Sequence, residues 1–543
     1  MTAAIVDAGD GLALTVPALL EVQAQRLGDH PLLITDDDTL SYAEAAGRSA
    51  TVAKGLLACG LGRASHVGLL HPNGAGFVVG WLAASRIGAV VVPLSTFSTG
   101  AELRGLLRRA DVGVLLAGPA FRGRDFLRAV SDAIPGIDLA VAPPLHAPVT
   151  PALRRVCFDS PPPDVHPGWT TSALVSAGEA VDDDVLEAAQ AGVAPGDRMV
   201  IVHTSGSTSE PKGVIHQHGP LIRHIDNLNQ LRRYREGEVL FSNSPFFWIG
   251  GFAYSLLGTL LAGATLVCSG AADASTTLDL LERTRPTMVN GFAQTVAHLA
   301  DDPSFAGRDL TSIQRGNLWP ILPDAARPAD PELRHNMLGM TEAGSVCLAS
   351  DDEGDQPEHR RGSFGRPVPG FEAQVVDLDS GSPCETGDVG ELWLRGPFLM
   401  EGYYGREHHE TFTPDGWYRT GDLFHVDADG FHYFRGRTGD MIKTAGANVS
   451  PREVEAAIAA LTGLVAHVVG IDDPGRGELV AAAIRVPPGH EWPDVDALRA
   501  ELRAHLSAYK VPRRILLLAD DDVPMLSSGK LDAAALKDRF GGR

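Results

Sequence analysis

The chain reads Thr204-Ser-Gly-Ser-Thr-Ser-Glu-Pro-Lys-Gly213 directly after the strand-like run Arg198–His203. Small hydroxyl residues and a glycine after a strand allow successive backbone N–H groups to face an anion, and Lys212 adds positive charge. Pro211 and Gly213 flank this lysine, whereas a Walker A loop has glycine before it and serine or threonine after it. The segment predicts a phosphate-binding loop that is not a Walker A loop; taken alone, a polar surface turn explains it equally well.

The hydrophobic pattern around this loop alternates between helices and short strands. Between Thr39 and Leu116 we expect helices and strands in turn, at Tyr42–Leu57, His66–Leu70, Gly76–Ile87, Ala89–Pro93, Ala101–Ala110 and Val112–Leu116. The alternation resumes from Val239 to about Met337 and predicts an α/β fold with a largely parallel sheet. The Pro-rich stretch Pro143–Pro167 is expected to be a surface loop, and Tyr254–Gly270 a buried helix that runs into a strand.

The pattern changes in the last third of the chain. Short strands with Asp-Gly turns over about residues 365–436 predict a β-rich subdomain. A compact α+β unit follows, with expected helices and strands at Pro451–Leu461, Ala466–Ile471, Leu479–Val486 and Val495–Leu506. We therefore divide the chain into a large N-terminal domain (1–436), a linker (437–440) and a small C-terminal domain (441–543).

Composition narrows the class of partner and the compartment. The chain has 46 basic and 68 acidic residues and a formal charge of −22, which argues against nucleic acid and anionic membranes as partners. The apolar stretch 254–270 is too short and too interrupted by glycine and threonine for stable membrane insertion. The scattered five cysteines and an acidic N-terminus without a basic region fit neither a disulfide framework nor a signal peptide, so we expect a cytoplasmic protein.

Further motifs carry chemistry that matches a phosphate loop. Gly339-Met-Thr-Glu342 offers a hydroxyl for a phosphate oxygen and a carboxylate for a hard cation such as Mg²⁺. Tyr418-Arg-Thr-Gly-Asp422 supplies a carboxylate for two ribose hydroxyls, and Gly436-Arg437 follows. Lys443-Thr-Ala-Gly446 and Pro524-Met-Leu-Ser-Ser-Gly-Lys530 lie nearer the C-terminus. Alone, each of these motifs is equally explained as a solvated loop.

In this order and spacing the motifs resemble those of the adenylate-forming superfamily of acyl-CoA synthetases, luciferases and nonribosomal-peptide adenylation domains. The resemblance runs from about Leu40 to the C-terminus. It implies that Thr341 and Glu342 contact the α-phosphate and Mg²⁺, and that Lys530 bridges the acyl carboxylate and the α-phosphate. The other nucleotide contacts that it implies are Thr204, Ser205, Gly206, Ser207, Thr208, Lys212, Gly339, Met340, Asp422 and Arg437.

The same resemblance implies two half-reactions that use ATP, Mg²⁺ and coenzyme A. The acid is first activated as an acyl adenylate, which a thiol then attacks. Between the two steps the small domain of the family rotates, here about Gly439, and removes the lysine. The rotation brings in the loop around Gly446, where a glycine would let the pantetheine arm pass close to the backbone.

An acyl pocket is also implied. Its expected walls are Phe246, Phe247, Trp248, Gly250, Phe292 and Val346. No acid is placed to hold an amino group, so a fatty, aromatic or polycyclic carboxylic acid is favoured over an amino acid. Plain core packing is the alternative explanation for Phe246 and Phe292.

The sequence departs from the family pattern at several positions. Ser209 stands where glycine is usual, Trp248 replaces a common histidine, and Gly439 replaces the usual aspartate or lysine. The segment Gly316–Leu322 differs from the expected adenine loop, and Leu338 replaces a frequent aromatic residue.

These departures leave alternatives open beside the favoured acyl-CoA ligase of fatty-acid and lipid metabolism. One is an acyl-AMP ligase or stand-alone adenylation enzyme that loads a carrier protein, and another is a degenerate nucleotide-binding homologue. A carrier protein is the less favoured acceptor because the spacing from Thr341 to Tyr418 leaves little room for the insertion found in that group. A homodimer is compatible with the sequence.

Overall fold

The computed structural model describes residues 11–204, 211–437, 441–487, 489–519, 522–524 and 531–541, with the backbone alone for residues 294 and 437. Several residues singled out above therefore lie outside the described residues: Ser205, Gly206, Ser207, Thr208, Ser209, Gly439, Lys530 and the side chain of Arg437.

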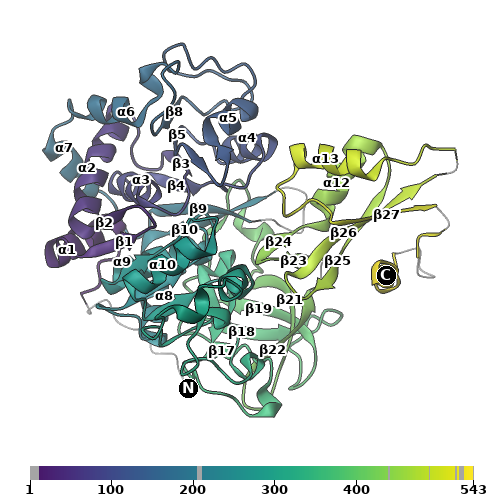
Figure 1. Ribbon diagram of the computed structural model, residues 1–543. Helices are drawn as coiled ribbons and strands as arrows, with labels where there is room; N and C mark the ends of the chain where they lie inside the picture. Colours follow the sequence, from purple (N-terminus) through teal and green to yellow (C-terminus); the bar gives the residue numbers. More distant parts are fainter. Residues whose placement is uncertain are drawn as a thin grey trace.

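A seven-stranded sheet forms the first half of the N-terminal domain in the described residues (Figure 1). Its order is β20 (Gly402–Tyr403), β10 (Lys212–Gln217), β9 (Arg198–Thr204), β4 (Val90–Pro93), β3 (His66–Leu70), β5 (Val114–Ala117) and β8 (Arg155–Phe158). The pairs from β9 to β8 are parallel, and β10 is antiparallel to both β9 and β20. Helices cover both faces, as the nearly continuous apolar runs of β4 and β5 require.

The helices of this half fall into two cores on opposite faces of the sheet. One face packs against α2 (Tyr42–Ala58) and α3 (Ala75–Arg86), and the other against α4 (Gly100–Arg109) and α5 (Phe126–Ala133). The remaining elements of this half are the short hairpin β6 (Ala120–Phe121) and β7 (Arg124–Asp125), α6 (Thr171–Gly178) and α7 (Asp183–Ala191).

One expectation for this half was wrong. The stretch 143–167, expected to be a surface loop, contains β8, which pairs in parallel with β5 at the edge of the sheet. Val156 and Cys157 of β8 are fully buried. The strand is only four residues long and lies among prolines, so its apolar content is too local to stand out in the sequence.

A six-stranded sheet forms the second half. Its order is β14 (Arg315–Gly316), β13 (Met288–Asn290), β11 (Val239–Ser242), β12 (Thr265–Val267), β1 (Pro31–Ile34) and β2 (Thr39–Ser41). The helices of this half are α1 (Val16–Leu27), α8 (His218–Leu231), α9 (Gly258–Ala262), α10 (Ala274–Thr284) and α11 (Ala297–Ala300). A π-helical segment, η2 (Gly250–Leu257), continues through α9 to β12, as expected for a buried helix that runs into a strand. No helix in the described part of the chain is long and apolar enough to cross a membrane.

The last third contains the expected β-rich part and a small α+β domain, so the fold class is confirmed. The β-rich part has β15 (Leu338–Met340), β16 (Ser345–Ala349), β17 (Arg366–Pro367), β18 (Glu372–Val376), β19 (Gly390–Arg395), β21 (Tyr418–Val426) and β22 (His432–Arg437). The small domain, yellow in Figure 1, has β23 (Ile442–Thr444), β24 (Ala447–Val449), α12 (Pro451–Thr462), β25 (Ala466–Asp473), β26 (Gly477–Val486), α13 (Val495–His505), β27 (Arg514–Ala519) and α14 (Ala533–Gly541).

Candidate active site

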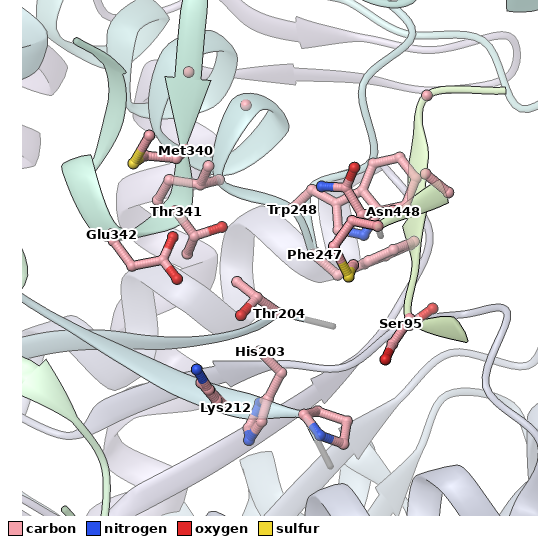
Figure 2. A pocket seen from close by; sticks show the side chains of 18 of the residues that line it. Ser95, His203, Thr204, Lys212, Phe247, Trp248, Met340, Thr341, Glu342 and Asn448 are labelled. Carbon is pink, nitrogen blue, oxygen red and sulfur yellow. The ribbon is translucent and has the colours of Figure 1, made fainter. Parts of the chain in front are cut away.

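A cavity of about 1360 Å³ lies between the N-terminal domain and the small C-terminal domain. Its lining brings together segments that are far apart in the sequence: both ends of the predicted phosphate loop, the Gly339–Glu342 motif, the aromatic segment after β11 and the β23–β24 hairpin. Figure 2 shows Lys212, Thr204, Glu342, Trp248 and Asn448 around this one space.

Two strands hold the ends of the predicted phosphate loop. Thr204 ends β9, Lys212 begins β10, and the two residues pair in antiparallel register. The Nζ of Lys212 lies 5.0 Å from the centroid of the Tyr403 ring. Burial, with a smaller contribution from Arg406, lowers the pKa of Lys212 from its ordinary value. The loop therefore leaves and re-enters the sheet at the cavity, with a cation at its exit.

Thr341 and Glu342 lie opposite Lys212, in the short helical turn that follows β15. The Nε2 of His216 donates a hydrogen bond to the carbonyl oxygen of Thr341 at 2.7 Å and so fixes the backbone of this turn. The hydroxyl of Tyr403 donates to Oε1 of Glu342 at 2.8 Å. The hydrogen bond to Oε1 thus orients the carboxylate of Glu342, which lies near the hydroxyl of Tyr403 and the ammonium group of Lys212.

The described residues suit Mg²⁺ bound by one carboxylate and by nucleotide phosphates. They contain no group of three or more His, Cys, Asp and Glu side chains that could hold a metal by themselves. Mg²⁺ in nucleotide-dependent enzymes is usually bound through one or two carboxylates together with substrate phosphates. The single oriented carboxylate of Glu342 fits that arrangement.

The remaining predicted nucleotide contacts are divided. Gly339, Met340 and Gly446 line the cavity. Asp422 is only 1% exposed and does not line it, although its neighbours Thr420 and Gly421 do. The backbones of Asp422 and Arg437 pair in register across β21 and β22, so the two predicted ribose contacts come from adjacent strands. Their ribose role stays a prediction.

Aromatic rings form the opposite wall. The ring of Phe247 lies edge-on to Phe97 (5.4 Å between centroids) and to Trp248 (5.4 Å), and Trp248 lies edge-on to Phe292 (5.6 Å). Such edge-to-face pairs add to the energy of apolar burial and hold the rings in defined orientations. Of the predicted acyl residues, those that line the cavity are Phe247, Trp248, Gly250, Phe292 and Val346.

Phe246 lies elsewhere. It is fully buried in the main core, its ring centroid is 5.3 Å from that of Phe77, and its backbone N–H donates to Oδ1 of Asn73 at 2.7 Å. The chain makes a turn at Pro245–Trp248, closed by the N–H of Trp248, which donates to the carbonyl oxygen of Pro245 at 3.0 Å, so adjacent aromatic residues face different surroundings.

Sequence reasoning missed Tyr254 and Met337, which also line the cavity. The Tyr254 hydroxyl donates to the Met337 sulfur at 3.6 Å, and the buried guanidinium of Arg232 lies 3.9 Å from the centre of the Tyr254 ring. Tyr254 lies six residues beyond Trp248, a spacing that does not place two side chains on one face of a regular helix, so it gave no signal. Met337 comes from a loop and had no signal either.

The small domain reaches the aromatic wall through a glycine. Gly446 lies in the turn between β23 and β24 with φ at +82°. A Cβ added there would lie 2.5 Å from Cδ1 of the Phe292 ring. Both the positive φ and the close approach require glycine at this position.

A buried ion cluster joins the two domains beside the cavity. The Nζ of Lys510 lies 2.7 Å from Oε1 of Glu102 on α4 and 2.7 Å from Oε1 of Glu453 on α12. The hydroxyl of Ser507 donates to Oε2 of Glu102 at 2.7 Å, and the rings of Phe97 and Tyr509 meet edge-on. We call Lys510, Glu102 and Glu453 the interdomain ion cluster.

The electrostatics of this cluster are unequal. Burial raises the pKa of Glu102, but the charge of Lys510 and the hydrogen bonds from Lys510, Thr99 and Ser507 outweigh it, so that pKa lies below its ordinary value. For Glu453 burial outweighs Lys510, and the pKa lies above its ordinary value. One lysine therefore holds two carboxylates that disfavour each other's charge.

Comparisons with known proteins agree with this arrangement. A feruloyl-CoA synthase of an Amycolatopsis species is 31% identical over 96% of this chain and 98% of its own length. A mitochondrial medium-chain acyl-CoA ligase of Mus musculus is 28% identical over 97% of this chain and 87% of its own. The solved structure of an o-succinylbenzoate CoA synthetase from Bacillus subtilis has the same fold, with a TM-score of 0.76, 23% identity, and coverage of 96% of this chain and 98% of that one.

The family models cover most of the chain. The model described as AMP-binding enzyme matches residues 20–404, and the model described as AMP-binding enzyme C-terminal domain matches residues 453–530. The large matched region precedes the small one, which is the order of domains that the motifs predicted. The chain therefore belongs to the family of AMP-binding enzymes.

Proposed function

We propose that the chain is an ATP-dependent acyl-CoA synthetase, an acid–thiol ligase that forms an acyl adenylate and transfers the acyl group to coenzyme A. One observation carries the proposal. A single cavity combines a cation, a hydroxyl and a carboxylate on one side, an aromatic wall on the other, and a glycine turn of the small domain that packs against that wall. Formation of the acyl adenylate needs the polar side and the aromatic wall around one acyl group, and transfer to the thiol also needs the part of the small domain that carries the glycine turn.

In the first step a carboxylate oxygen of the acid forms a bond to the α-phosphorus of ATP, and the bond from that phosphorus to pyrophosphate breaks. Two anions approach each other, so the chain must offset negative charge at both. Lys212 and the hydroxyls of Thr204 and Thr341 are available for phosphate oxygens, and we assign the bridging cation to Lys530. Glu342 would hold Mg²⁺, which when bound neutralises charge on the phosphates.

In the second step the sulfur of coenzyme A attacks the carbonyl carbon of the acyl adenylate, and the bond to AMP breaks. The thiol proton leaves to solvent. The structure brings the Gly446 turn against Phe292, one of the acyl-wall residues. The missing side chain lets this turn of the small domain pack directly against the acyl wall. A thin pantetheine arm that enters along the turn would then end beside the acyl group, which supports coenzyme A as the acceptor.

The acid is proposed to be hydrophobic. The lining residues between Ser244 and Ser255 and between Asn290 and Phe292 carry no charged side chain. The names of the relatives cover both medium-chain acyl groups and the aromatic feruloyl group. A role in fatty-acid metabolism is one form of this proposal and aromatic-acid metabolism another.

We further propose a cytoplasmic location and allow for a homodimer. Each of the five cysteines is free, which suits a reducing compartment. The homodimer stays a prediction.

The decisive experiment is a panel of carboxylic acids assayed with ATP, with and without coenzyme A. We expect pyrophosphate release to depend on the acid, and thioester formation, followed by mass spectrometry, to depend also on coenzyme A. Pyrophosphate release without a thioester would favour an acyl-AMP ligase that loads a carrier protein. No acid-dependent release across aliphatic, aromatic and polycyclic acids would favour a degenerate homologue.

A further inference from the structure

Three asparagines lie at one edge of the six-stranded sheet, where β11, β13 and β14 end. Asn243 follows β11, Asn290 ends β13 and Asn317 follows β14. Because these strands are parallel, their carboxyl ends meet at the edge beside the cavity. The three amides therefore lie close together, but they are not used in the same way.

Two of the asparagines hold the backbone that leads to the acyl wall. Asn243 accepts a hydrogen bond from the N–H of Phe292 at 3.0 Å and donates to the carbonyl oxygen of Phe292 at 3.2 Å. Asn317 accepts from the N–H of Gly291 at 3.0 Å and donates to the carbonyl oxygen of Gly291 at 2.8 Å. Their amides are occupied, and their role is structural.

The third amide is unused. Asn290 is 7% exposed and lines the cavity. No hydrogen bond joins its side chain to another residue in the part of the chain that the structure describes. Its polar atoms are not among the fully buried polar atoms that lack a partner, so the amide is open to the cavity and can bind water there. A ligand that fills the cavity displaces this water, and leaving the amide unpaired would then cost about 1–3 kcal/mol unless the ligand supplies a hydrogen bond.

The strand register shows where this amide lies. Val289 packs into the core on one face of the sheet, together with Phe241. Asn290 is next in the strand and faces the other side, as does its register partner Ser242. The hydroxyl of Ser242 lies 2.9 Å from that of Ser255 on η2, and Ser255 lines the cavity. Asn290 thus faces η2, the segment that follows Trp248.

The surroundings limit what the amide could bind. The lining residues of its own segment and of η2, the segment it faces, include Phe292, Tyr254 and Ser255, none of which is charged. An amide both donates and accepts hydrogen bonds, so it suits a hydroxyl, ketone or ether oxygen. A second carboxylate or a sulfonate would enter this part of the cavity without a lining cation and is disfavoured.

We propose that Asn290 is a specificity-determining residue that hydrogen-bonds an uncharged oxygen on the acyl part of the substrate. The inference rests on the proposed function, which it narrows from hydrophobic acids in general to hydrophobic acids that carry such an oxygen. The enzyme would discriminate between acids with and without this oxygen, because an acid without it excludes water from the cavity and leaves the amide of Asn290 without a hydrogen-bond partner.

The test uses matched acids that differ by one oxygen: cinnamate with 3- and 4-hydroxycinnamate, and decanoate with 8- and 9-oxodecanoate. In the wild-type enzyme we expect kcat/KM for the oxygenated acid of at least one pair to exceed that of its partner by roughly 10-fold or more, the discrimination of one hydrogen bond. Asn290→Leu should remove this ratio, and Asn290→Ser should restore part of it. Val346→Leu alters the wall without changing a polar group, so it should change kcat/KM for both acids of a pair by the same factor.

Two results would overturn the inference: ratios within about 3-fold for every pair in the wild type, or an Asn290→Leu variant that lowers both acids of a pair equally. Measuring the binding of the acids distinguishes a failure of this inference from a failure of the proposed function. Should no acid be turned over, dissociation constants from the fluorescence of Trp248, with Trp248→Phe as the control for the signal, still report on the pairs. Equal constants would refute the role of Asn290, and unequal constants that Asn290→Leu equalises would support it.

Discussion

Replacing Lys510 with methionine tests whether the interdomain ion cluster holds the small domain in its place at the cavity. Methionine keeps much of the length and apolar surface of lysine but removes the charge. The side chains of Lys510, Glu102 and Glu453 are 7%, 14% and 13% exposed. The variant therefore leaves two buried carboxylates facing each other without a counter-ion.

The magnitude follows from the burial. Removing one partner of a buried ion pair typically costs about 3–5 kcal/mol. The cost here is near the lower bound, because the domains can separate and let the carboxylates regain water. A change of ~3 kcal/mol lowers the equilibrium constant for docking of the small domain by roughly 100-fold. Since docking brings Gly446 to the acyl wall, we expect thioester formation from supplied acyl adenylate to fall, by at most that factor.

The assay measures both half-reactions separately, as single-turnover thioester formation and as acid-dependent pyrophosphate release. Adenylation is expected to stay within about 3-fold of the wild type, well below the change of the transfer step. Lys537→Met, at an exposed position of α14, controls for loss of a lysine in the same domain. Glu453→Gln in the Lys510→Met background should restore part of the transfer rate, because it removes one of the stranded charges. A folded Lys510→Met variant with unchanged transfer, or with equal losses in both steps, would refute the reasoning.

Four further predictions follow from the site. Lys530→Ala should lower adenylation by about 10²–10³-fold, the usual cost of losing one charge at a reacting anion, while sparing transfer; an equal loss in both would mean a structural role. Gly446→Val should block transfer, since its Cβ meets the Phe292 ring; it contradicts the proposal if thioester forms at the wild-type rate. Trp248→Ala should change the preferred size of the acid without weakening ATP binding, and a lower melting temperature alone would make it a core residue. Acid should destabilise the fold between pH 6.5 and 4, because burial lowers to about 4 the pKa of three histidines, which are neutral when folded and gain protons on unfolding. Each histidine should lower the free energy of unfolding by ~1.4 kcal/mol per pH unit in this range. Urea unfolding at pH 4.5 to 8 measures this slope, and a flat profile would contradict the prediction. These histidines are His203, His216 and His218.

Much of the fold was predictable because its signals are local. Helices α2, α3 and α4 begin and end within one residue of the expected ranges, since capping residues and amphipathic spacing act over a few positions. The capping boxes at Ser41 and Thr99 are such signals. The family was predictable as well, because its motifs are short, contiguous and ordered, and the comparisons confirm it.

Other features depend on residues that are distant in the chain. Whether an aromatic residue lines the cavity or fills the core is decided by the turn before η2, in which Phe246 enters the core and Phe247 faces the cavity. The predicted roles of Lys530 and Gly439 lie outside the described residues and stay predictions.

The amino-acid sequence by itself determined the family and the order of the domains, and it predicted the chemistry of the phosphate-side motifs, because each of these depends on residues that are neighbours in the chain. Only the tertiary structure decided that Lys510 is shared between Glu102 and Glu453, and that Asn290 is unpaired while Asn243 and Asn317 are not. Single lysines and asparagines carry no local signature. Their partners come from other strands and from another domain, so their roles arise only when the packed chain places polar groups together and removes them from water.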